Sequence, residues 1–106
     1  MTGPGDLGNL LKQAQKMQRE MDLAREEIRQ STLEGSAGGG MARVEVDGDG
    51  NVKAIHLSEE ALAEGDKGAV EDLILVAIRD AQAQAAEVKR ERLSKVTGGM
   101  DLPGLF

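Results

Sequence analysis

The chain has 106 residues and a formal net charge of −6, and Phe106 is its only aromatic residue. It has no cysteine, which excludes disulfides and thiolate metal sites, and no apolar run approaches the roughly 18 residues that a membrane span requires. A chain of this length buries about 65% of its unfolded surface when it folds as one unit. We therefore predict a single domain over residues 1–106, with an aliphatic core and no membrane partner.

The first predicted element is a helix from Leu7 to about Gln30, with Asp6 as its N-cap. Residues 1–9 have neither the basic start nor the apolar stretch of a secretory signal, so a cytoplasmic location is expected. The apolar residues of the helix recur at heptad spacing and form one stripe: Leu7, Leu10, Leu11, Ala14, Met17, Met21, Leu23, Ala24 and Ile28. This stripe predicts an amphipathic helix that packs against a partner.

Three short extended segments are predicted next, over Thr32–Ala37, Ala42–Asp47 and Val52–Leu57. The second of them alternates apolar and polar residues, as expected for a strand with one buried face. Gly38–Gly40 and Asp47–Asn51 separate the segments and contain residues that tolerate turn conformations. The sequence therefore predicts a three-stranded antiparallel meander.

A second long helix is predicted from about Lys67 to Val96, after a short helical turn, Glu59–Ala63, that Ser58 caps. Its first half is rich in leucine and isoleucine and is expected to cover the sheet. Its alanine-rich second half is expected to allow close helix–helix approach. Two glycines after Val96 end the helix, and residues 98–106 are expected to form a loose or docked tail.

The predicted lengths of the two helices carry an expectation about assembly. They would run about 36 Å and 45 Å, whereas a compact chain of this size has a radius of gyration of only about 13 Å. The helices should therefore overhang the sheet, and their apolar stripes then need the other helix or a second copy as a partner. The expected fold is α+β, in the order α-β-β-β-α, assembled as a homodimer.

No catalytic or metal site is predicted. The only histidine, His56, lies on a predicted strand without a nucleophile, so we interpret it as a structural or surface residue. Asp47–Asn51 begins like an EF-hand loop, but Val52 and Ser58 stand where such a loop needs glycine and a bidentate glutamate. Gly38–Gly40 lacks the lysine that follows in a phosphate-binding loop. The chain is thus expected to be a non-enzyme without a cofactor.

The charges are unevenly distributed. Val44–Asp72 holds nine acidic and two basic residues, net −7, so the rest of the chain is net +1. Within that remainder, residues 12–19 and 89–95 are each net +3 and lie near an end of a predicted helix. Their basic residues are the candidate DNA contacts: Lys12, Lys16, Arg19, Lys89, Arg90, Arg92 and Lys95. The same cations could instead complement a helix C-terminus or pair with acids one turn away, and both interpretations stay open.

Four segments resemble one known family in their order and spacing: Leu10–Met17, Glu34–Gly40, Glu71–Ile74 and Thr97–Gly104. On these residues the chain resembles the YbaB/EbfC family of bacterial nucleoid-associated proteins over nearly its whole length. The resemblance implies a homodimer with its sheets joined at the centre and paired helices projecting like the arms of tweezers. It also implies DNA binding and a role in nucleoid organisation, with contacts at the seven basic residues named above.

The expected partners are therefore double-stranded DNA and a second copy of the chain. Because the chain is acidic and nearly free of aromatic residues, we expect phosphate contacts without base stacking, and selectivity only through DNA shape. A rival interpretation is a protein-interaction adaptor for the replication or recombination machinery, without direct DNA binding. In that case the apolar stripes or the acidic segment would dock the protein partner.

Overall fold

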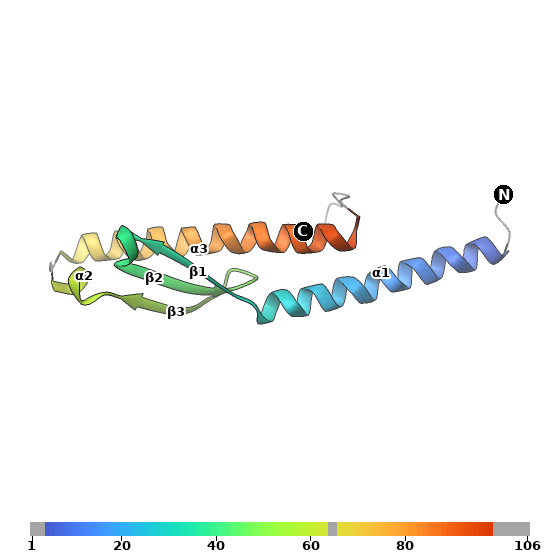
Figure 1. Ribbon diagram of the computed structural model, residues 1–106, viewed down its shortest axis with the longest axis horizontal. Coiled ribbons are helices and arrows are strands. Elements are labelled where there is room, and N and C mark those ends of the chain that lie inside the picture. The colour runs from blue at the N-terminus through green and yellow to red at the C-terminus, as the bar shows by residue number, and fades with distance from the viewer. Residues whose placement is uncertain (1–3, 64–65, 99–106) are drawn as a thin grey trace.

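A computed structural model describes residues 4–63 and 66–98 as an elongated molecule of two long helices and one sheet (Figure 1). The elements in chain order are α1 (Pro4–Gln30), β1 (Thr32–Ala37), the 3-10 turn η1 (Gly38–Gly40), β2 (Ala42–Asp47), β3 (Val52–Leu57), α2 (Glu59–Ala63) and α3 (Lys67–Val96). This order confirms the predicted α+β fold. The tail predicted over residues 98–106 lies outside the described residues from position 99 onward.

The strands form the predicted antiparallel meander, in the order β1-β2-β3. Gly35 faces Val44 across the first pair, and Val44 faces Ile55 across the second. The alternation in β2 places Val44 and Val46 on one face, where both are fully buried. The three glycines of η1 all have positive φ, which confirms the predicted tight turn and explains why residues without a Cβ occupy it.

Helix α3 covers that buried face with its N-terminal half, as predicted, since Leu73 and Ile78 pack against the cluster that the face forms. Ala77, Ala81 and Ala85 form one hydrophobic cluster with the buried residues of β1 and β2. The alanine stripe thus approaches the sheet closely and not a helix, whereas the C-terminal half of α3 meets α1 through Leu93. The physical reason lies in Gly35 of β1, where a Cβ would stand only 2.2 Å from the backbone nitrogen of Ala81. Small residues on both sides let the helix backbone approach the strand itself.

Gly35→Ala is expected to lower the free energy of unfolding by about 3 kcal/mol, because the added methyl group overlaps helix backbone that no rotamer change can move. Urea denaturation of the purified variant measures this loss. Gly8→Ala is the matched control, since its Cβ would meet nothing within 4 Å and alanine favours the helix. An unchanged unfolding midpoint for Gly35→Ala would contradict the close packing of α3 on β1.

Helix α1 begins earlier than predicted. It starts at Pro4, and Asp6 lies in its first turn, so the assignment of Asp6 as the N-cap is wrong. Proline fits the first turn of a helix because the backbone N–H groups of that turn have no intrahelical acceptor, so the N–H that proline lacks is not needed. The helix dipole favours an acidic side chain in the same turn. Helix α3 begins at Lys67, as predicted, and Asp66 caps it by accepting a hydrogen bond from the backbone N–H of Ala69.

A second cluster joins the two long helices. Met21, Ala24 and Ile28 of α1 are buried with Leu93 of α3, and Val96 packs against them. Because α3 ends at Val96, the N-terminal part of α1 continues past it without a neighbour in the described chain (Figure 1). The principal extents of 72 × 20 × 17 Å and the radius of gyration of 20.2 Å confirm the predicted overhang. We call residues 4–19, the projecting part of α1, the arm.

Candidate nucleic-acid interface

Three candidate cations lie on the outer face of the arm. Successive helical residues are rotated by about 100°, which places Lys12, Lys16 and Arg19 on the side of α1 opposite Met21 and Ile28. All three side chains are exposed, and Lys16 makes only a long contact, 3.9 Å, with Glu20. Within the described chain Lys12 and Arg19 have no ion-pair partner. The arm therefore presents a row of cations to solvent.

The four candidates on α3 do not form a comparable row. The same rotation distributes them around the helix, so they face different neighbours. Lys89 Nζ lies 2.8 Å from Asp49 Oδ1, and an Arg92 nitrogen lies 2.9 Å from Glu27 Oε2 on α1. These two ion pairs connect α3 to the turn between β2 and β3 and to α1. Two of the predicted contacts are thus already engaged inside the molecule.

The remaining two α3 cations differ from each other. An Arg90 nitrogen lies 2.6 Å from Glu87 one turn earlier, and this hydrogen bond and charge hold the pKa of Glu87 below its ordinary value. Lys95 is exposed and, among residues 4–63 and 66–98, has no ion pair with Glu91 or another acid. Lys95 is therefore the α3 candidate whose charge is most available to a ligand.

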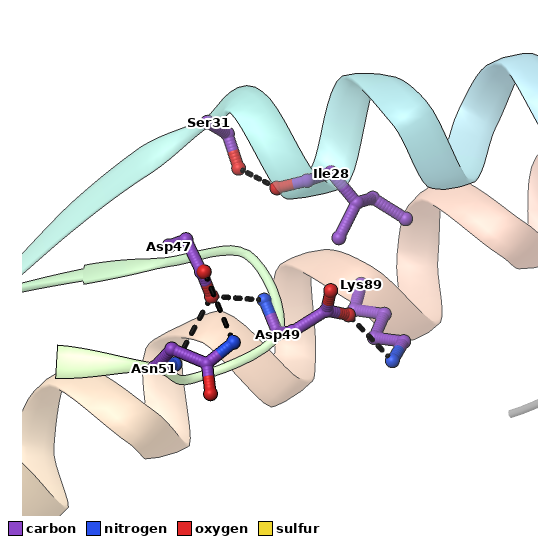
Figure 2. A network of polar contacts seen from close by, with 6 residues as sticks. All are labelled: Ile28, Ser31, Asp47, Asp49, Asn51 and Lys89. Carbon is purple, nitrogen blue, oxygen red and sulfur yellow. Dashed lines mark hydrogen bonds and ion pairs between the residues drawn. The ribbon is translucent and has the colours of Figure 1, made fainter. Parts of the chain in front are cut away.

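The turn between β2 and β3 connects the two long helices (Figure 2). Asp47 accepts hydrogen bonds from the backbone N–H groups of Asp49 and Asn51 and from the Asn51 side chain. The N–H of Gly48 donates to the Ile28 carbonyl at the end of α1, 3.0 Å away. On the other side of the turn, Lys89 of α3 reaches Asp49. We call this arrangement the joint, because it fixes α1, the turn and α3 against one another.

The Asp47 carboxylate is committed to the turn, which explains why the EF-hand similarity fails. Its oxygens receive N–H donors that a cation would have to displace. Within the described residues no group of three or more His, Cys, Asp or Glu side chains is placed to hold a metal ion.

His56 Nε2 lies 2.8 Å from Glu45 on the exposed sheet face, and this hydrogen bond lowers the pKa of Glu45. His56 is thus paired across two strands.

Acid is expected to loosen the joint in a predictable direction. Hydrogen bonds from the Asn51 side chain, and then from backbone N–H groups, lower the pKa of Asp47 in the folded chain. The stabilisation is therefore complete above the unfolded pKa of about 3.9 and is lost as the pH falls through the lowered folded value. Carboxyl and amide NMR titration should show Asp47 and the Asn51 amide shifting together below that ordinary pKa. Titration of Asp47 at its ordinary pKa would contradict this interpretation.

The charges are separated along the molecule. The acidic residues of α2 and of the first turns of α3 lie at the end of the molecule opposite the arm (Figure 1): Glu59, Glu60, Asp66, Glu71 and Asp72. Lys12, Lys16 and Arg19 lie on the arm at the other end, and Lys95 lies near the base of the arm, where α3 ends. A polyanion approaching the arm therefore avoids most of the acidic charge that makes the whole chain net −6.

One surface was not singled out from the sequence. Helix α3 packs on β1 and β2, and β3 forms the uncovered edge of the sheet, where Val52 is 44% and Ile55 46% exposed. Leu75, also 44% exposed, lies two helical turns before Gln82, which donates to the Gly50 carbonyl at the start of β3. We call Val52, Ile55 and Leu75 the edge patch. Strand alternation was the available signal, but it does not reveal which edge the helix leaves open.

Comparisons with known proteins identify the family of the chain and support its fold. The sequence profile of the YbaB/EbfC DNA-binding family matches residues 3–100. A nucleoid-associated protein of Acetivibrio thermocellus is 43% identical over 103 residues, which cover 96% of this chain and 91% of that protein. The crystal structure of an uncharacterized protein from Helicobacter pylori matches with a TM-score of 0.68 at 24% identity, over 93% of this chain and 100% of that one. This last likeness supports the fold. No described helix is both long and apolar enough to cross a membrane.

Proposed function

The chain belongs to the YbaB/EbfC DNA-binding family, and from this premise we propose that it organises the nucleoid as a homodimer that grips double-stranded DNA with its arms. The family is one of nucleoid-associated DNA-binding proteins and not a family of enzymes. The relative in Acetivibrio thermocellus carries the corresponding description. Binding then takes place in the nucleoid, in the cytoplasm.

The observation that supports this proposal best is the row of exposed cations on the arm. Lys12, Lys16 and Arg19 have no strong internal partner, so their charges are available to phosphates without breaking contacts within the fold. Phosphate contacts give affinity through counterion release and need no particular base sequence. Lys95 adds a fourth available charge on the neighbouring helix end.

We assign a different role to Lys89 and Arg92. Their ion pairs with Asp49 and Glu27 join α3 to the rest of the molecule, so they act on DNA binding by setting the direction of the arm. Arg90, which is paired with Glu87 on its own helix, serves as a peripheral phosphate contact. The seven basic residues therefore divide into contacting and positioning groups.

The edge patch supports the homodimer. An unpaired strand edge with exposed apolar residues is a ready template for another strand, and a second copy offers the same surface by symmetry. Joining two sheets at this edge places both arms at the outer ends of the assembly. Two arms on one duplex also raise the overall affinity, because the second contact becomes intramolecular.

A titration of duplex DNA at several salt concentrations tests the proposal. Six to eight available cations in a dimer predict a slope of log K against log salt between about −5 and −7. A flat slope would overturn DNA binding through phosphates. Absence of DNA retardation at low salt, together with a replication or recombination protein retained from nuclease-treated lysate, would favour the adaptor function instead.

A further inference from the structure

The apolar seam of α1 continues past the part that α3 covers. Met21, Ala24 and Ile28 are buried against Leu93, but Leu7 is 61% and Leu10 57% exposed on the same side of the helix. Leu11 is 58% exposed beside them, and Ala14 and Met17 continue the seam toward Met21. An uncovered apolar strip of this length on a soluble protein marks a docking surface.

The strip is also hollowed. A groove of about 360 Å³ lies at the base of the arm and is lined by Ala14, Met17, Gln18, Met21, Asp22 and Arg25. Three of its lining residues are apolar, Ala14, Met17 and Met21, and three are polar, Gln18, Asp22 and Arg25. The groove includes Met21, which is buried with Leu93, and extends from there to Ala14 in the arm.

The segment of chain that follows α3 begins at this place. Thr97 ends the helix, and Gly98 turns the backbone with a φ of +68°. Residues 99–106, which lie outside the described residues, include four apolar side chains in eight positions: Met100, Leu102, Leu105 and Phe106. Pro103 within them opposes a continued helix. By its sequence, the segment offers four apolar side chains and disfavours a continued helix.

We propose that residues 99–106 dock along the exposed seam of the arm and cover it from Met17 toward Leu7. Eight extended residues reach about 26 Å, and the seam between these two residues is about 15 Å long. Because the segment is tethered beside its site, it competes effectively with any free partner. Leu93 and Val96 of α3 cover the seam from Met21 to Ile28, and the apolar residues of the segment cover the part nearer the N-terminus.

This docking leaves the DNA-binding face free. Lys12, Lys16 and Arg19 lie on the opposite side of α1, so both faces of the arm are occupied independently. The docked segment adds a second layer to the arm, which is otherwise a single helix. The stiffer arm then holds its three cations in a fixed direction. The inference does not depend on DNA binding, and its test needs no DNA.

A nitroxide label tests the position of the segment. The chain has no cysteine, so Gly104→Cys gives one unique attachment point. Labelled, ¹⁵N-enriched chains diluted into excess unlabelled chains report only contacts within one chain. We expect broadened amide signals for residues 7–17 of α1 and unaffected signals in β2. Unaffected arm signals would overturn the proposal, as would broadening seen only when the label and the ¹⁵N are on different chains, which would identify a second copy as the occupant.

Hydrogen exchange gives an independent readout. Removal of residues 99–106 should speed amide exchange in residues 7–17 about tenfold or more, the effect of uncovering one leucine side chain. Leu105→Ser combined with Phe106→Ser should reproduce the acceleration, whereas the control Asp101→Ser keeps every apolar group and should not. Exchange in Val44 and Val46 reports the fold and should stay unchanged. Equal arm exchange in all variants would contradict the docking.

Discussion

DNA affinity and its salt dependence should both collapse when Lys12, Lys16 and Arg19 are replaced together by glutamine. Each substitution occurs twice in a dimer, so six phosphate contacts are lost and the salt slope falls by about five. Folding should be unaffected, because these side chains are exposed and only Lys16 has even a long ion pair. Gel shift or fluorescence anisotropy at several salt concentrations measures the slope, and circular dichroism checks the helices.

The matched comparison is Lys89→Gln combined with Arg92→Gln, which removes two cations that are already paired with Asp49 and Glu27. Each partly exposed pair contributes at most about 1 kcal/mol, so this variant should lose modest stability. We expect weaker DNA binding with a nearly unchanged salt slope. The direction of the arm is then less firmly fixed, but the arm keeps all of its cations. A loss of slope equal to that of the arm variant would show that Lys89 and Arg92 contact phosphates directly.

Local signals account for how much of the fold could be predicted. The bounds of α3 and of all three strands follow from period and turn residues, because Asp66, Ser58 and the glycines act on their immediate neighbours. The overhang follows from helix length alone. The start of α1 was missed because Pro4 and Asp6 both favour a first turn, and local chemistry does not decide between an N-cap and a position one turn later.

Contacts between segments that are far apart in the sequence could not be predicted. The alanine stripe of α3 fits a helix or a strand equally well, and only Gly35, more than 40 residues away, selects the strand. The candidate cations show the same limit. Residues 89–95 are net +3 when counted alone, but Asp49 and Glu27 neutralise two of those charges from other elements. The arm cations kept their predicted exposure because no other described element packs on that face.

Ile55→Glu is expected to separate the proposed homodimer into monomers. Ile55 is 46% exposed in the single chain, so a glutamate there remains solvated and the fold tolerates it. At a sheet-to-sheet contact, however, two copies of the same carboxylate would meet or be buried without partners, which disfavours association strongly. Sedimentation or light scattering should report the mass of one chain at concentrations where the parent protein is twice as heavy.

DNA binding should weaken with the dimer, because two linked arms exceed the affinity of one by about 10² to 10⁴. Val76→Glu is the matched control: Val76 is 52% exposed on the same helix as Leu75 but turned about 100° away from the edge patch. That variant carries the same added charge, so it should remain dimeric and keep its affinity apart from a small electrostatic loss. If Ile55→Glu stays dimeric, the copies meet elsewhere. If it becomes monomeric with full affinity, a single arm suffices for DNA and the tweezer arrangement is wrong.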